Sequence, residues 1–289
     1  MTTIAPPPTS QPPVLSSGRR TGIRFGLVAV AVVLVACSVV ALAVLAFGLS
    51  TFRVITDSQK LTPGVRSLTV DSGDVPVIVR VTGDTTGSEP RVDLRMLTSS
   101  RENTRRLIVA NDAGGSRVTL GTSGVSYLPW SRLAEITVVL PPGIARGISV
   151  TVHQQTGLLF TDADLDQLTA AVDSGALTLG GSARRVDVRV TDGDISTRNP
   201  VAVTESLRAN TNNGDITLAF RSAPRTVEAT SNNGDIELTV PGPGPYRVLA
   251  RSEGRHGDTT VTVPQSSDAG APAVTARSNN GDVKVTELR

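Results

Sequence analysis

The sequence predicts an all-β domain of stacked repeats, similar to a β-solenoid, after one N-terminal transmembrane helix. Three observations support this prediction. A Gly-Asp-hydrophobic signature recurs through the C-terminal half, apolar and polar residues alternate with a period of two, and residues 25–49 contain no charge. A β-sandwich or a meander is the alternative, because short alternating strands also build those folds.

The composition limits the kind of core that this chain can build. Of its 289 residues, 3% are aromatic and 19% are charged, so the core must come from Val, Leu, Ile and Ala, which suits thin β layers. Residues 1–53 contain four arginines and no acid, which leaves 24 bases against 26 acids in the rest. This mildly acidic remainder has no basic surface for phosphates, and we expect no nucleic-acid partner.

The N-terminal region predicts a tail followed by a membrane anchor. Residues 1–24 are rich in Pro, Ser and Thr and are expected to be a disordered tail. As a helix, residues 25–49 would span ~37 Å, more than the ~30 Å hydrocarbon core of a bilayer. A buried core helix and a cleaved signal peptide are the alternatives, but the apolar region of a signal peptide is only about 7–15 residues long.

Charge sets the expected orientation of this anchor. Arg19, Arg20 and Arg24 crowd its N-terminal side, so the positive-inside rule places the tail in the cytoplasm and the rest of the chain outside. Residues 50–64 are then expected to be a linker, and residues 65–289 an extracytoplasmic β-repeat domain.

The repeat is visible at a series of glycines. Four copies are almost superimposable: Asp192-Gly193-Asp194-Ile195, Asn213-Gly214-Asp215-Ile216, Asn233-Gly234-Asp235-Ile236 and Asn280-Gly281-Asp282-Val283. Gly257-Asp258-Thr259 is a looser copy, and Gly157 and Gly175 mark degenerate ones, so the seven glycines are spaced by 18, 18, 21, 20, 23 and 24 residues. A period near 20 indicates one supersecondary unit stacked on itself.

Each unit predicts two strands and two turns. Gly accepts a positive φ and Asn tolerates it, so the Asn-Gly pairs are expected at tight corners. The Asp that follows can cap free N–H groups of the turn. Residues 65–151 carry one more copy, Ser72-Gly73-Asp74-Val75, with irregular spacing around it; they are expected to be a divergent first part of the fold or a cap.

These features resemble the bacterial "putative adhesin" family of exported β-repeat domains. The matching residues are the Gly-Asp-Ile/Val units at 193–195, 214–216, 234–236 and 281–283, with the stretch from Ile136 to Pro141, Val150 to Val152 and Gly157. The likeness covers about residues 65–289. It implies a right-handed stacked β fold on the outer face of the membrane, and it supplies no catalytic residues.

A search for reactive groups yields few candidates. His153 and His256 are the only histidines and Cys37 the only cysteine, and no zinc, nucleophile-elbow or phosphate-loop motif is present. Tyr127-Leu128-Pro129-Trp130 holds the only Trp, which suits either a core anchor or a ligand platform. Paired acids for glycoside hydrolysis, Asp162 with Asp164 or Asp192 with Asp194, form a further alternative.

The main chemical candidate is an acidic column. It would contain Asp194, Asp215, Asp235 and Asp282, with Asp74 and Asp258 as further members. Stacked in register, these carboxylates would lie about 4.8 Å apart, and Ca²⁺ could relieve their repulsion. We favour turn capping, because one carboxylate per rung gives too few oxygens for a shell of about six to eight ligands.

The sequence therefore predicts no catalytic, cofactor-binding or metal-binding residues. The expected function is a membrane-anchored envelope protein with a non-enzymatic, adhesin-like or structural ectodomain. Its expected partners are the membrane itself and an unknown envelope protein or glycan. The alternative function is that of an accessory sensor in an envelope-stress system, and a polysaccharide-active enzyme is the third hypothesis.

Overall fold

The computed structural model describes residues 30–32, 34–35, 37–42, 52–62, 64–84, 89–99, 106–112, 114–121, 134–254 and 257–288. The chain divides into two compact units, Met1–Phe52 and Arg53–Arg289.

The first unit is helical from residue 30 to residue 42, with two gaps, and its last residue, Phe52, begins a strand. Ser38 Oγ donates to the Leu34 carbonyl at 2.8 Å, one turn earlier. Within the described residues, no helix has the length and apolar character needed to cross a membrane. The expected tail, residues 1–24, and much of the expected anchor, residues 25–49, lie outside the described residues.

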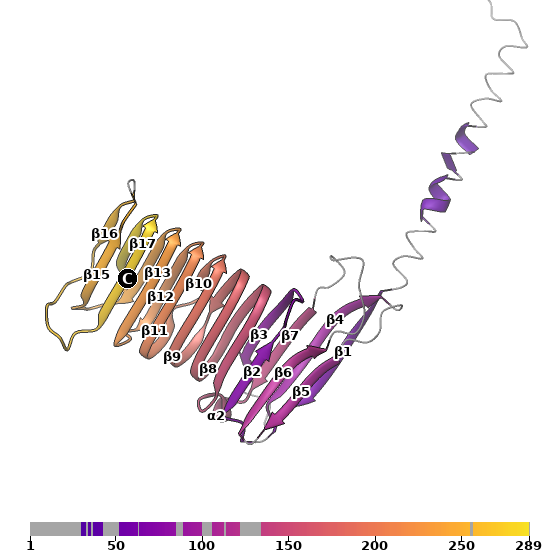
Figure 1. Cartoon of the computed structure of the whole chain (residues 1–289), viewed down its shortest axis with the longest axis horizontal. Helices are drawn as coiled ribbons and strands as arrows, with labels where there is room; N and C mark the ends of the chain where they lie inside the picture. The colour runs from indigo at the N-terminus through magenta and orange to yellow at the C-terminus, as the bar shows by residue number, and fades with distance from the viewer. Residues whose placement is uncertain are drawn as a thin grey trace, which may run out of the picture. The chain divides into compact units, whose positions relative to one another are not determined.

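The second unit is a stack of β-strands, most of them parallel (Figure 1). Its first part contains β1 (Phe52–Lys60), β2 (Ser67–Asp71), β3 (Val77–Gly83), β4 (Arg91–Ser99), β5 (Arg106–Asp112), β6 (Gly115–Gly121), β7 (Ala134–Leu140) and the short helix α2 (Pro142–Ala145). Its second part contains β8 (Ser149–Leu179), β9 (Gly181–Asp192), β10 (Ile195–Thr197), β11 (Val201–Asn213), β12 (Ile216–Ser222), β13 (Thr226–Asn233), β14 (Ile236–Pro241), β15 (Arg247–Ser252), β16 (Thr259–Val261), β17 (Ala273–Asn280) and β18 (Val283–Leu288).

Successive rungs stack in register. β13 lies parallel to β11, with Leu207 opposite Val227, and β14 lies parallel to β12, with Ile216 opposite Ile236. A rung is therefore one strand, an Asn-Gly-Asp corner and a second strand. This parallel stacking confirms the predicted stacked-repeat fold and excludes the β-sandwich and the meander, whose neighbouring strands run antiparallel.

Alternate residues of each strand point into the stack and form its core. β13 and β14 both alternate between buried and outward-facing positions. Side chains at one position form columns along the stack, as Leu168, Val186, Leu207, Val227 and Val274 do. All five are buried, and full burial of an aliphatic side chain stabilises by about 1.5–3 kcal/mol. The alternation read from the sequence thus supplies the core directly.

The spatial order of the rungs differs from the chain order at both ends. β17 and β18 pair with β13 and β14 on one side and with β15 and β16 on the other. Likewise, the rung of β2 and β3 lies between β6 and β7 on one side and β8 on the other. The C-terminal repeat is therefore inserted before the looser repeat at Gly257. The C-terminal repeat carries two asparagines that match those of the rung at Asn233, whereas the looser repeat at Gly257 does not. This match gives a physical reason for the pairing.

The prediction that residues 50–64 form a linker is wrong. β1 occupies most of it and pairs with β4. Ser58 Oγ bonds Asp93 Oδ1 at 2.5 Å, and Gln59 Nε2 donates to the Leu107 carbonyl at 2.9 Å. The polar composition hid a period of two, since alternate side chains of β1 are exposed from Val54 to Lys60.

The first part of the stack is irregular, as expected for a capping section. β4 pairs antiparallel with β7, and β5 pairs antiparallel with β6. This change of direction ends the parallel stacking at that side of the unit, which is one way to cover an open strand edge.

Candidate binding surface

The Asn-Gly-Asp corners lie above one another and begin with a column of glycines. Gly175, Gly193, Gly214, Gly234 and Gly281 all have φ between 144° and 153°. A Cβ on Gly234 would lie 2.1 Å from the carbonyl oxygen of Gly214. The positive φ expected at these turns is confirmed, and the close approach of successive rungs is a second reason for glycine.

The aspartates that follow these glycines form a hydrogen-bonded ladder. Each Oδ1 accepts the backbone N–H of the aspartate in the adjacent rung, at 2.8 or 2.9 Å; the bonds run from Asp215 to Asp194, from Asp235 to Asp215, from Asp282 to Asp235 and from Asp258 to Asp282. The aspartates thus cap backbone N–H groups, but each capped N–H belongs to the adjacent rung and not, as expected, to the aspartate's own turn.

The two extra candidates for the acidic column behave differently. Asp258 joins its end through Asp282. Asp74 does not, because Gly157 stacks on Val77 and places Asp74 outside the register of the corners. Among the residues that the structure describes, no group of three His, Cys, Asp or Glu side chains could hold a metal ion.

Two rows of asparagine amides run beside the aspartate ladder. In the outer row, Asn232 Nδ2 donates to Asn212 Oδ1 at 3.2 Å and Asn279 Nδ2 donates to Asn232 Oδ1 at 2.7 Å. The second row joins Asp192, Asn213, Asn233 and Asn280 by bonds of 2.6 to 2.9 Å. All these side chains are exposed, so one edge of the stack presents amides and carboxylates at regular spacing.

A ladder of hydroxyl groups also lies on the inner side of the Asn-Gly-Asp corners. Ser231 Oγ donates to the Gly214 carbonyl at 3.0 Å, and Ser278 Oγ donates to the Gly234 carbonyl at 2.8 Å. Thr211 makes the same bond to Gly193 at 3.0 Å. Both serines are fully buried, so each hydroxyl satisfies a carbonyl that water would otherwise have to reach. This row was not predicted from the sequence, although its position two residues before each Asn-Gly pair was a signal.

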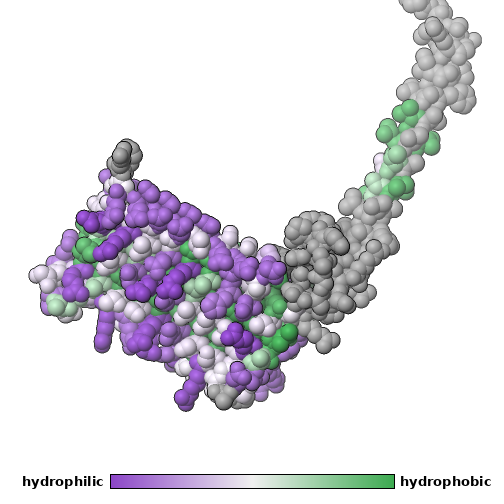
Figure 2. Space-filling model, viewed as in Figure 1, coloured by the Kyte–Doolittle hydropathy of each residue, from purple (hydrophilic) through white to green (hydrophobic). Residues whose placement is uncertain are grey.

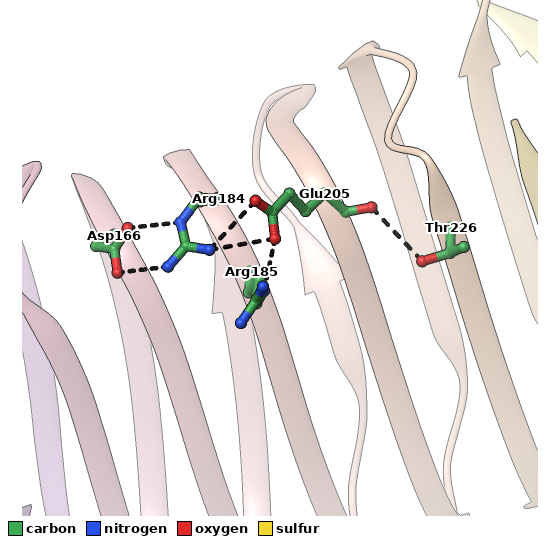
Figure 3. Close-up of polar contacts among 5 residues, drawn as sticks. All are labelled: Asp166, Arg184, Arg185, Glu205 and Thr226. Atoms are coloured by element: carbon green, nitrogen blue, oxygen red, sulfur yellow. Dashed lines mark hydrogen bonds and ion pairs between the residues drawn. The ribbon is translucent and has the colours of Figure 1, made fainter.

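A cluster of ion pairs joins three rungs (Figure 3). Arg184 bonds both oxygens of Asp166 at 2.8 and 2.9 Å and both oxygens of Glu205 at 3.2 Å. Arg185 adds a bond of 2.6 Å to Glu205. The hydrogen bond from Arg184 lowers the pKa of Asp166, and the bonds from Arg185 and then Arg184 lower the pKa of Glu205. This cluster ties adjacent rungs together, and the sequence analysis missed it.

The remaining candidates are scattered rather than assembled. His153 is exposed on β8, while His256 and the loop Tyr127–Trp130 lie outside the described residues. Asp164 accepts Ser182 Oγ at 2.5 Å, and Asp192 accepts Asn213. Cys37 is exposed in the first unit.

The face of the stack seen in Figure 2 is mainly hydrophilic over its strands. Together with the stacked rungs and polar ladders, this surface defines a β-repeat protein of the solenoid class.

The family model described as Toastrack DUF4097 matches residues 67–286. The chain therefore belongs to the Toastrack DUF4097 family.

Solved structures of bacterial proteins are similar to this chain. A putative adhesin from Bacteroides fragilis is 17% identical, with 82% of this chain and 97% of that chain covered and a TM-score of 0.41. A putative adhesin from Parabacteroides distasonis is 10% identical, with the same coverage and a TM-score of 0.42. A putative cell adhesion protein from Clostridium sporogenes is 9% identical, with 82% and 100% covered and a TM-score of 0.35.

No curated protein matches the chain. The resemblance drawn from the Gly-Asp repeats is confirmed at the level of the family.

Proposed function

We propose that this chain is a membrane-anchored protein of the cell envelope whose β-repeat unit acts outside the cytoplasm as a non-enzymatic, adhesin-like binding surface. The observation that carries the proposal is the regular outer row of Asn212, Asn232 and Asn279, joined by amide hydrogen bonds along the stack. Parallel strands are about 4.8 Å apart, so equivalent donors and acceptors repeat along a line. Such a line suits an extended partner, such as an envelope glycan or an extended protein segment.

The composition of the first unit supports the anchoring part of the proposal. Residues 25–49 have no charge, and Arg19, Arg20 and Arg24 precede them. A protease added to spheroplasts should digest residues 51–289 and leave the N-terminal tail intact. Protection of the β-repeat unit from the protease would refute the extracytoplasmic location.

A binding assay tests the surface itself. The full chain in lipid nanodiscs would be presented to a glycan array and to isolated cell envelopes. Replacing Asn212, Asn232 and Asn279 together by Ser should lower retention on the envelope, because the amide row is lost. Asn210→Ser on β11, outside that row, is the matched control and should bind like the unaltered chain.

Three outcomes distinguish the competing hypotheses about the function. Retention by glycans supports the adhesin-like surface. Retention only through an envelope membrane protein would replace it by the accessory-sensor reading. Turnover of an envelope polysaccharide by the purified chain would overturn the non-enzymatic part.

A further inference from the structure

One surface row contains an aromatic ring where its neighbours are small or charged. Phe160 on β8 lies opposite Arg80 on β3, and farther along the stack the parallel strands present Thr178 opposite Ser196. Leu159 beside it is fully buried, whereas Phe160 is partly exposed on the outer face. The row therefore drops from a bulky ring to small hydroxyl side chains, which leaves a step in the surface.

Two guanidinium groups lie against this ring. The Cζ of Arg80 is 5.0 Å from the ring centroid, and the Cζ of Arg198 is 5.7 Å from it. Arg80 also contacts Glu135 at 3.4 Å. Arg198 is exposed, and in the part of the chain that the structure describes it makes no ion pair. A guanidinium that lies over an aromatic ring contacts the ring with its flat face. The N–H donors in the guanidinium plane therefore stay available to a ligand.

The step is a small pocket whose lining includes both hydrogen-bond donors and a carboxylate acceptor. Phe160, Asp162, Thr178, Gly180, Arg198 and Asn199 contribute to its lining, around a cavity of about 70 Å³. Gly180 forms part of the pocket wall, and a Cβ there would lie 2.7 Å from the Thr161 carbonyl oxygen. Asp162 is exposed, and its carboxylate has no hydrogen bond or ion pair among the described residues.

These groups match one chemical class of ligand. We propose that the pocket binds an acidic saccharide, with the sugar's carboxylate on Arg198 and its hydroxyls on Asp162 and Asn199. A planar guanidinium binds a carboxylate through two parallel hydrogen bonds. The Asp162 carboxylate only accepts hydrogen bonds, so it selects sugar hydroxyls and disfavours the sugar's own carboxylate. Phe160 lines the pocket and offers apolar surface to C–H groups of the sugar ring.

This inference rests on the proposed function, since it names a ligand for a site on the same exported unit. The test uses the full chain in lipid nanodiscs and isothermal titration calorimetry. The probes are an oligogalacturonate and a neutral galactose oligomer of the same length. We expect the acidic oligomer to bind at least about tenfold more tightly than the neutral one, and to bind less tightly as salt is added.

Matched variants assign the binding to this pocket. Arg198→Gln should weaken binding of the oligogalacturonate about tenfold or more. Arg277→Gln is the control, because Arg277 is exposed on β17, away from the pocket, and has no ion pair among the described residues. Melting temperatures of both variants check that they fold. Equal binding of the two oligomers, no binding of either, or an unchanged affinity in Arg198→Gln would each overturn the proposal.

The two proposals fail in different ways. If the oligogalacturonate does not bind but the chain is still retained on isolated envelopes, only the acidic-saccharide pocket is refuted. If the chain is not retained on envelopes while Arg198→Gln still abolishes oligogalacturonate binding, the pocket stands and the broader adhesin-like function fails.

Discussion

The Oδ1 atom of Asp215 accepts a hydrogen bond of 2.8 Å from the backbone N–H of Asp235, twenty residues later. Because the two aspartates occupy the same corner in adjacent rungs, the bond links one repeat to the next. The carboxylates of Asp194, Asp215, Asp235 and Asp282 therefore each have one oxygen committed to the backbone. The Gly-Asp signature is thus a stacking device as much as a turn signal.

Removing this acceptor should weaken the stack. Asp215→Ala leaves the N–H of Asp235 without its partner, and we expect the free energy of unfolding to fall by about 1–2 kcal/mol. Asp215→Asn retains an acceptor oxygen and should cost less than about 0.5 kcal/mol. Urea unfolding of the full chain measures both values.

Asp74→Ala is the control for that experiment, because Asp74 is exposed and lies outside the ladder. It should change stability little. Equal losses for Asp74→Ala and Asp215→Ala would contradict a specific role for the ladder.

The glycine column should tolerate no side chain. Gly234→Ala forces a Cβ to within 2.1 Å of the Gly214 carbonyl oxygen at a φ of +149°, so strain and overpacking add. We expect a loss of about 3 kcal/mol or more. Gly143→Ala in α2 meets no atom within 4 Å and should stay within about 0.5 kcal/mol of the unaltered chain. Similar melting temperatures for the two variants would be incompatible with tightly stacked corners.

The buried hydroxyl row should be sensitive to deletion and insensitive to a conservative change. Ser231→Ala removes the donor to the Gly214 carbonyl, and we expect a loss of about 1 kcal/mol. Ser231→Thr keeps the hydroxyl, and Thr211 already occupies the equivalent position in the adjacent rung. Chemical unfolding should therefore rank the Thr variant above the Ala variant, and the reverse order would contradict the assigned bond.

Acid should weaken the ion-pair cluster around Arg184. The pKa values of Asp166 and Glu205 are lowered in the folded chain by their arginine partners. Their contribution to stability is therefore fully present above the unfolded pKa values and is lost as the pH falls through the folded ones. We expect the melting temperature to decline between about pH 5 and about pH 3, partly through this cluster.

Arg184→Gln isolates that contribution. The variant should show a shallower decline of melting temperature over the same pH range, because its carboxylates titrate nearer their ordinary values. Arg277→Gln, which removes an arginine outside the cluster, should keep the original slope. An unchanged slope in Arg184→Gln would show that the cluster does not contribute to acid sensitivity.

Local patterns predicted the repeat unit well. The alternation in Ile216–Phe220 and Ile236–Val240 places buried side chains where the structure has them, because a strand turns successive side chains to opposite faces. Gly214 and Gly234 were recognisable as corners for a similarly local reason. The polar segment from Val54 to Lys60 was misread because its pairing with β4 depends on a partner about forty residues away.

The sequence by itself determined the strands, the corners, the period and the aliphatic core, since each depends on residues near one another in the chain. Only the tertiary structure decided the order of the rungs, with the repeat at Gly281 placed before the one at Gly257. It alone showed that Asp215 caps the next rung, that Arg184 joins Asp166 to Glu205, and that Arg198 reaches Phe160. These contacts join residues 18 to 38 positions apart, and their formation depends on which strands pair in the stack.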